Sequence, residues 1–117
     1  MELKIRAWHK ERKKYYEVSE IDFILKVVEV IDNLINDFRL CKFEEVIIEQ
    51  YTGLKNKSGE MCIGDIVKTS HGNLYVSTYR GSLVFRDKDD IRICLVDDTY
   101  YENTITIGTI NENKELL

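Results

Sequence analysis

The chain has 117 residues, enough for one domain or two small lobes, and its 44% hydrophobic and 32% charged residues are typical of a soluble globular protein. The formal net charge of −4 argues against nucleic-acid binding over a broad surface, because domains that bind in this way are usually basic. The first 14 residues nevertheless carry a local charge of +4 and the remainder −8, which leaves one small basic region able to contact phosphate.

The first segment of the chain predicts a β-hairpin. In "LKIRAW" (Leu3–Trp8) apolar and basic side chains alternate, as in a half-buried strand, and "YYEV" (Tyr15–Val18) is expected to return beside it. The charged turn between them supplies four candidate nucleic-acid contacts, Lys10, Arg12, Lys13 and Lys14. The flanking aromatic residues can stack on bases or pack into the hairpin, and we favour packing because a short charge run is usually a solvated turn.

Residues 21–40 allow two interpretations. Apolar side chains recur at spacings of three and four, which fits an amphipathic helix capped by Ser19 or Asp22. The segment "FILKVVEVI" is also rich in β-branched residues, which favour strands, and Asp32-Asn33 has the composition of a turn. We favour a strand over residues 23–31 and keep the helix as the alternative.

The second half of the chain predicts short strands separated by turns. A strand over Phe43–Tyr51 leads into a polar, glycine-punctuated connector at 51–64, and the remaining strands are expected at Asp65–Thr69, Leu74–Tyr79, 83–85, Ile91–Val96 and Thr104–Ile110. The final residues predict one helical turn. Strands at this density indicate a small barrel or a strongly bent sheet.

Together these patterns predict an α+β, mainly β fold. It comprises an N-terminal β-hairpin region and a C-terminal SH3-like or barrel-like antiparallel sheet. We predict one domain over residues 1–117, with an N-terminal part of about 1–50, a connector at 51–64 and a C-terminal sheet part at 65–117.

The residues with reactive side chains do not form a catalytic or ligand-binding pattern. His9 and His71 have no partner at metal-ligand spacing, and both are expected in exposed turns. Cys41, Cys62 and Cys94 are odd in number and widely separated, which favours free buried thiols. The acidic runs lack the spacing of a calcium loop, and no glycine-rich phosphate loop is present. We therefore predict no enzymatic activity, no cofactor and no catalytic or metal site.

The sequence also predicts a cytoplasmic protein that does not bind a membrane. The charged N-terminal residues lack the apolar centre of a signal peptide. The longest apolar runs are interrupted by charges well before the roughly 18 residues that a membrane-spanning helix needs.

Three segments in the same order resemble the YopX family, small proteins of bacteriophages and prophages. "QYTGLKNKSGEMCIGDIVK" is similar to the family's Q-Y-T-G-L-K-D-K-N-G followed by E-G-D-I-V. "LKIRAWHKERKKYYEV" resembles its K-F-R-A-W-D-K and M-Y-E-V, and "IGTINENKELL" resembles its I-G-N-I-Y-E-N-P-E-L-L. The likeness extends over nearly the whole chain.

The resemblance implies a non-enzymatic accessory protein that self-assembles. The family has no established catalytic activity to transfer, so a homo-oligomer and an unidentified phage or host protein are the expected partners. The residues that carry the resemblance are mainly types used for turns and packing, and we interpret them as structural: Trp8, Gln50, Tyr51, Thr52, Gly53, Leu54, Gly59, Gly64, Asp65, Gly108, Asn111, Glu112 and Asn113.

Overall fold

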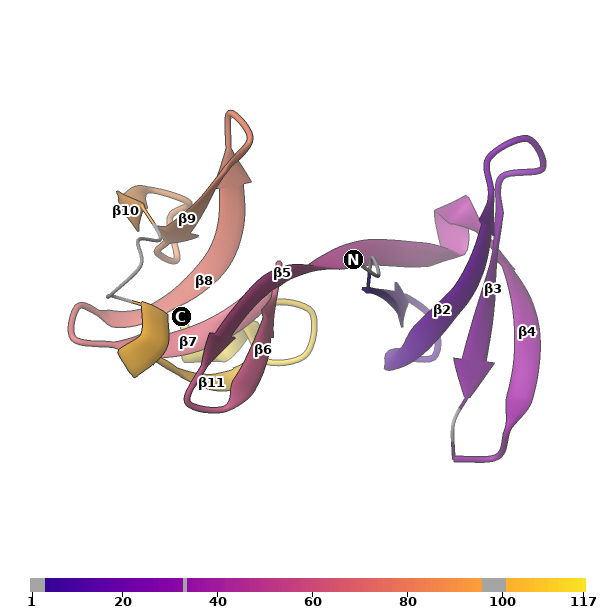
Figure 1. The fold of residues 1–117 in the computed structure, drawn as a ribbon, viewed down its shortest axis with the longest axis horizontal. Coiled ribbons are helices and arrows are strands. Elements are labelled where there is room, and N and C mark those ends of the chain that lie inside the picture. Colours follow the sequence, from indigo (N-terminus) through magenta and orange to yellow (C-terminus); the bar gives the residue numbers. More distant parts are fainter. Residues whose placement is uncertain (1–3, 33, 96–100) are drawn as a thin grey trace. The chain divides into compact units, whose positions relative to one another are not determined.

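The computed structural model describes residues 4–32, 34–95 and 101–117, which fold mainly into antiparallel β-strands (Figure 1). The strands are β1 (Ile5–His9), β2 (Lys14–Asp22), β3 (Val27–Asp32), β4 (Asp37–Lys42), β5 (Val46–Asn56), β6 (Gly59–Cys62), β7 (Asp65–Thr69), β8 (Gly72–Tyr79), β9 (Ser82–Arg86), β10 (Arg92–Leu95) and β11 (Ile105–Thr109). Short 3-10 helices occur at Phe43–Glu45, Tyr101–Asn103 and Lys114–Leu116. The predicted mainly β fold and the C-terminal helical turn are confirmed.

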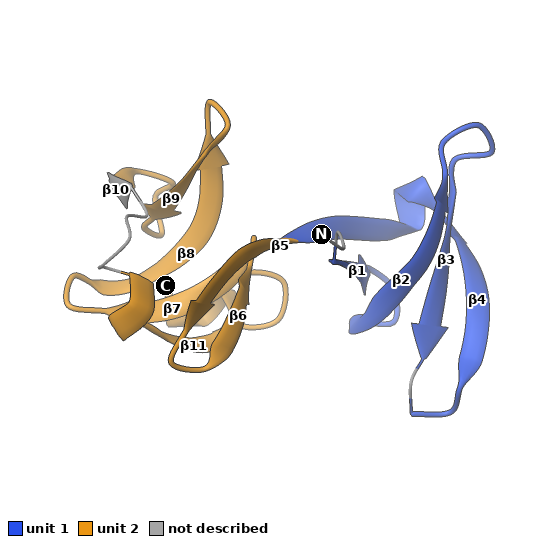
Figure 2. Ribbon diagram, in the orientation of Figure 1, with its two compact units in different colours: residues 1–50 blue, residues 51–117 orange. Residues whose placement is uncertain are grey.

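The chain forms two compact units, residues 1–50 and 51–117, shown in blue and orange in Figure 2. Strand β5 belongs to both: its first half pairs with β1 over Val46–Gln50, and from Tyr51 onward it pairs with β6. Residues 51–64, interpreted above as a connector, therefore consist largely of strand.

Unit 1 contains antiparallel strands in the order β4-β3-β2-β1-β5, in which β1 to β4 form a meander and β5 returns beside β1. Because successive side chains of a strand point to opposite faces, one face of this sheet collects the apolar residues. Its core contains Ala7, Tyr16, Val28, Val30, Cys41 and Val46. The predicted strand is present and Ala7 is fully buried, but its burial does not alternate as predicted, because Trp8 and His9 are buried as well.

The structure of residues 21–40 differs from both predictions made from the sequence. These residues hold the end of β2, the tight turn at 23–26, strand β3 and part of β4, so both the helix and the continuous strand over 23–31 are wrong. The Asp22 carboxylate stops β2, because its Oδ1 accepts the backbone N–H groups of Ile24 and Leu25, each at 2.9 Å. Lys26 completes the turn at φ +56°.

Unit 2 contains a five-stranded sheet in the order β10-β9-β8-β7-β11, together with the β5–β6 hairpin. Its core is formed by Met61, Val67, Leu74, Val76 and Phe85. Within the described residues, β10 and β11 are the two edges of an open sheet. The expected antiparallel sheet is present, and over the residues that the structure describes it does not close into a barrel.

A tyrosine of unit 2 gives a testable pH dependence. Tyr75, on β8, donates its hydroxyl to the Asp90 carboxylate. Burial, reinforced by this hydrogen bond, raises the pKa of Tyr75 from 10.0 to about 12. The folded state therefore prefers the neutral phenol, and the resulting stabilisation is present below pH 10 and is lost as the pH rises toward 12.

We expect Tyr75→Phe to remove one tyrosine that titrates near pH 12. Ultraviolet absorbance of the phenolate would measure this as the difference between wild type and the variant. Replacement of another tyrosine, Tyr79→Phe, serves as the control because Tyr79 lies at the exposed end of the same strand. A Tyr75 contribution already complete at pH 10 would contradict the prediction.

Candidate interaction site

The outstanding surface feature of unit 1 is a set of large hydrophobic side chains in contact with solvent. Isolated examples are common on protein surfaces, whereas a concentration along one part of a sheet marks an interaction surface. Seven side chains, between 56% and 92% exposed, lie on β4 or in the turns on either side of β3, and we call them the apolar surface: Phe23, Ile24, Leu25, Leu34, Ile35, Phe38 and Leu40.

The alternation of β4 places part of this surface on the outer face of the sheet. Cys41 points into the core, so Phe38 and Leu40 point to the opposite face. Their cross-strand partners on β3 are Ile31 and Glu29, respectively. Leu40 is 71% exposed, because no other strand or helix of unit 1 covers this face in the described residues.

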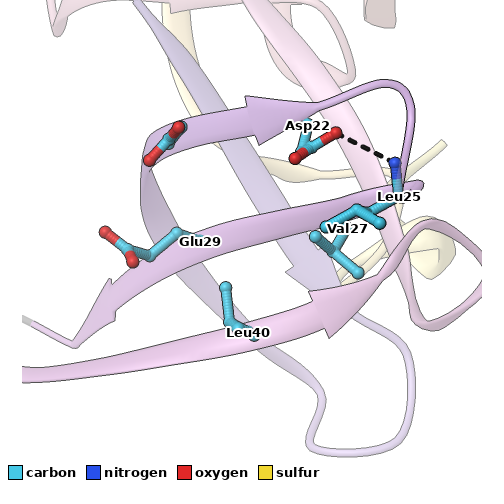
Figure 3. A pocket seen from close by; sticks show the side chains of 6 residues that line it. Asp22, Leu25, Val27, Glu29 and Leu40 are labelled. Carbon is cyan, nitrogen blue, oxygen red and sulfur yellow. Dashed lines mark hydrogen bonds between the residues drawn. The ribbon is translucent and has the colours of Figure 1, made fainter.

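A small depression lies in this face between β2, β3 and β4 (Figure 3). Its volume is about 140 Å³, and its lining consists of three apolar and three acidic side chains: Leu25, Val27, Leu40, Glu20, Asp22 and Glu29. Figure 3 shows Val27, Glu29 and Leu40 on adjacent strands and the hydrogen bond from Leu25 to Asp22. This chemistry suits an apolar or cationic side chain of another protein, since carboxylates around an apolar floor repel anions.

The aromatic residues beside the basic turn are packed into unit 1. Trp8 and Tyr16 are only 7% and 6% exposed. The ring of Trp8 lies 4.8 Å from that of Tyr15, and the Arg6 guanidinium lies 4.3 Å from the centre of the Tyr15 ring. The predicted packing of these aromatic side chains is confirmed, so they do not form a platform for stacking bases.

Two of the four basic candidates, Lys10 and Arg12, donate side-chain hydrogen bonds to other groups of unit 1. Lys10 Nζ donates to the Glu44 carbonyl oxygen at 3.1 Å, and Arg12 Nη1 donates to the Tyr16 hydroxyl at 3.3 Å. This bond to Tyr16 raises the pKa of Arg12 above its ordinary value. Lys13 lies in the turn at φ +54°.

The fourth basic candidate, Lys14, pairs with a carboxylate of the adjacent strand. Its Nζ donates to Asp32 Oδ2 at 2.7 Å, and this bond is the main reason that the pKa of Asp32 is lowered from its ordinary value of 3.8. The folded state therefore favours the ionised carboxylate. Its stabilisation is present above pH 3.8 and is lost as the pH falls through the lowered pKa.

We expect Asp32→Asn to destabilise the protein at neutral pH and to have a progressively smaller effect below pH 3.8, where the wild-type carboxylate also becomes protonated. Urea unfolding of unit 1 at several pH values measures this dependence. The exposed carboxylate Glu102 provides the control variant, Glu102→Gln. An Asp32→Asn effect that is constant over the whole pH range would contradict the prediction.

The family segment after Gln50 forms the strand pair β5–β6 rather than a binding loop. Gly53 adopts φ +83° at a register shift between Tyr51 and Lys55. Thr52 stabilises this irregularity, because its hydroxyl donates to the Met61 carbonyl oxygen at 2.9 Å and accepts the Leu54 N–H at 3.1 Å. The glycine therefore provides a left-handed backbone conformation at a β-bulge.

The central and C-terminal family segments meet inside unit 2. The Ile110 N–H donates to the Gly64 carbonyl oxygen at 2.9 Å, and the Asp65 carboxylate, which is buried, accepts the Cys62 N–H at 2.8 Å. Asn113 packs against Gly108, where a Cβ atom would lie 2.6 Å from Asn113 Oδ1. These contacts are structural.

The other residues of the family segments also lie in strands and turns. Glu112 exchanges hydrogen bonds with Thr109, its N–H donating to Thr109 Oγ1 at 3.2 Å and its Oε1 accepting from that hydroxyl at 3.3 Å. Leu54 packs against the core of unit 2. The remaining members are Trp8 in β1, Gln50 and Tyr51 in β5, Gly59 at the start of β6, and Asn111 in the turn after β11.

One histidine differs from its predicted environment. His9 is 5% exposed at the end of β1, and its Nδ1 accepts the Arg12 N–H at 3.1 Å, while its Nε2 lies 3.7 Å from Glu45 Oε2. Its role in closing the basic turn explains its burial. His71 is exposed in the turn before β8, as predicted.

The thiols and acidic residues show no chemical site in the described part of the chain. Cys41 and Cys62 are buried thiols, as predicted, and burial raises the pKa of Cys41, which disfavours its nucleophilic thiolate. The prediction for the Cys94 side chain lies outside what the structure describes. Among the described residues, no group of three or more His, Cys, Asp or Glu side chains is placed to hold a metal ion.

The apolar surface was not predicted from the sequence. The available signal was the position of "FIL" and "LI" on either side of the β-branched run of β3, because apolar residues in turns have no core to enter. The helical alternative placed most of these side chains on an apolar stripe, and the favoured strand over 23–31 included only the first three of them.

Comparison with known proteins supports the resemblance found in the sequence. A family model described as YopX protein matches residues 4–117. No curated protein matches the chain. Among the described residues, no helix has the length and apolar character required to cross a membrane.

Proposed function

This chain belongs to the YopX family, and we propose that it is a non-enzymatic accessory protein of the phage or prophage type that acts through protein–protein contacts and self-assembly. Its site of action in this proposal is the cytoplasm of the host cell. Its partners are further copies of the chain and a phage or host protein, and it uses no cofactor.

The apolar surface of unit 1 is the observation that carries this proposal. Burying one Leu, Ile or Phe side chain contributes about 1.5–3 kcal/mol, so burial of several of these exposed side chains across a contact can offset the entropic cost of association. A surface that served only to keep the protein soluble would have charged residues at these positions, as does the turn between β9 and β10 in unit 2.

Size-exclusion chromatography with light scattering tests self-assembly. We expect the average mass to rise above the 13.8 kDa of one chain as the concentration increases to tens of micromolar. A mass equal to one chain throughout this range would overturn the self-assembly part of the proposal. Affinity capture from phage-infected cells, followed by mass spectrometry, would then identify any other protein partner.

Nucleic-acid binding by the basic turn is the second candidate function. The observation that favours it is the exposure of Lys10, Arg12 and Lys13 within one short turn. Electrophoretic mobility with single-stranded and double-stranded DNA and RNA at low salt tests it, with Lys10→Glu/Lys13→Glu as the matched variant. Failure of every nucleic acid to shift the wild type removes this alternative.

A further inference from the structure

Strand β4 is an unusually regular sheet edge. In the described residues its only strand neighbour is β3, and the two pair without interruption over six residues. The other three edge strands, β6, β10 and β11, each pair with a register shift. Bulges and short lengths protect sheet edges from pairing with another chain, and β4 has no bulge.

The β11 edge of unit 2 is also covered by its own chain. The Lys57 N–H donates to the Thr104 carbonyl oxygen at 3.1 Å, and the Thr106 N–H donates to Ser58 Oγ at 3.1 Å. These bonds occupy backbone groups at the start of the strand. The sheet edges are therefore unequally protected from pairing with another chain, and β4 is the edge best able to accept another strand.

Charge determines how two copies can meet at the apolar surface. Stacking the outer faces of two copies would bring together the carboxylates of Glu20, Asp22 and Glu29 from each copy, and like charges in such a contact are costly. Pairing at the β4 edges keeps the carboxylates of the two copies apart, since Glu20 and Asp22 lie on β2 and Glu29 lies on β3.

The sequence of β4 also selects one antiparallel register. A two-fold axis perpendicular to the sheet keeps equivalent faces of the two copies on the same side, and it places one residue of β4 opposite the same residue of the second copy. The two alignments that pair most of the strand have Arg39 or Leu40 at this central position. Centring on Arg39 places two guanidinium groups directly opposite each other, which is destabilising. Centring on Leu40 places two leucines together and Phe38 opposite Lys42 of the second copy, where the ammonium group can lie over the ring.

We propose that two copies of this chain pair antiparallel through β4, with Leu40 opposite Leu40, to form one continuous sheet from their two N-terminal units. This inference rests on the proposed self-assembly and specifies its contact surface. The pairing joins the apolar surfaces of the two copies at Leu40 and Phe38, and it satisfies backbone groups at the β4 edge.

Cysteine cross-linking tests the register directly. In a Cys94→Ser background, Leu40→Cys is expected to give a disulfide-linked dimer under mild oxidation, because directly opposed residues have Cα atoms roughly 4.5–5.5 Å apart. Phe38→Cys alone and Lys42→Cys alone are expected to stay unlinked, since identical positions are then about 13 Å apart along the strands. A mixture of the Phe38→Cys and Lys42→Cys chains is expected to cross-link.

A charge variant tests the contribution of the same contact to association. Leu40→Lys places two ammonium groups opposite each other and is expected to raise the dimer dissociation constant at least about tenfold. Ile105→Lys is the matched control, because Ile105 is an exposed isoleucine on the β11 edge of unit 2. Circular dichroism of both variants verifies the fold.

The outcomes separate this inference from the proposed function. Cross-linking at Leu40 together with weakened association of Leu40→Lys supports β4 pairing. Self-association that persists unchanged in Leu40→Lys, or dimers linked through Phe38→Cys alone, overturns the β4 register and leaves self-assembly standing. A wild type that remains a single chain at tens of micromolar overturns both.

Discussion

Replacing Phe85 by alanine is expected to lower the free energy of unfolding of unit 2 by about 3–5 kcal/mol. Phe85 lies on β9, has no exposed surface and packs in the cluster with Met61, Leu74 and Val76. Truncation removes buried apolar area and leaves a cavity in the centre of the small sheet. Because a domain of this size is stable by only about 5–15 kcal/mol, the change removes a large part of the total.

The matched control for this prediction is Phe38→Ala, which has the same chemistry at a side chain that is 56% exposed. Its effect on stability is expected within about 0.5 kcal/mol at concentrations where the protein is monomeric. Hydrogen exchange of the amides in β7–β9 reports unit 2, and fluorescence of Trp8, the single tryptophan, reports unit 1. A loss below 1 kcal/mol for Phe85→Ala would contradict its assigned role.

The second large effect is expected at Gly108, in the C-terminal family segment. A Cβ atom added there would lie 2.6 Å from Asn113 Oδ1 and 2.9 Å from Asn113 Cβ. Asn113 cannot withdraw freely, because its N–H donates to the Thr109 carbonyl oxygen at 2.8 Å and its Oδ1 accepts the Thr109 N–H at 3.3 Å. We expect Gly108→Ala to cost about 1–3 kcal/mol by overpacking.

A double-mutant cycle separates this clash from general glycine effects. In an Asn113→Gly background the clashing side chain is gone, so Gly108→Ala is expected to cost at least about 1 kcal/mol less than in the wild type. Gly53→Ala provides the comparison, because Gly53 has open space around it and its φ of +83° makes the cost purely conformational. Additive effects of the Gly108 and Asn113 changes in urea unfolding would show that the contact is not responsible.

Phe85 and Gly108 both belong to unit 2, and the two units differ in what their residues do. The family segments of unit 2 are engaged in turns, bulges and close packing around Gly53, Gly64 and Gly108. The apolar surface and the regular β4 edge both belong to unit 1. The residues that identify the family are therefore largely different from those that we propose for assembly.

Much of the fold could be predicted from local patterns. Alternation in Leu3–Trp8 correctly indicated a strand with Ala7 buried, and Asp65–Thr69 was predicted with the bounds that β7 has in the structure. Strand alternation is a local property, so it can be recognised in the sequence without knowing which strands lie side by side. The hairpin turn at 23–26 was not predicted, because an aspartate side chain, rather than a glycine, forms it.

The candidate interaction surface could not be predicted, because burial depends on what covers a residue. Leu40 and Val30 are both aliphatic strand residues, yet one is 71% exposed and the other is fully buried. The difference is set by the face of the sheet on which each side chain lies and by the position of β4 at an edge. Both depend on strand order, which the sequence pattern does not specify.

The sequence by itself determined the mainly β class, the family and the packed state of the aromatic residues beside the basic turn, because these follow from alternation and short-range motifs. The tertiary structure alone decided that β4 is an edge, that His9 is buried, and that the sheet of unit 2 remains open within the described residues. Those features arise from which strands pair across long stretches of chain, and pairing is a property of the assembled sheet.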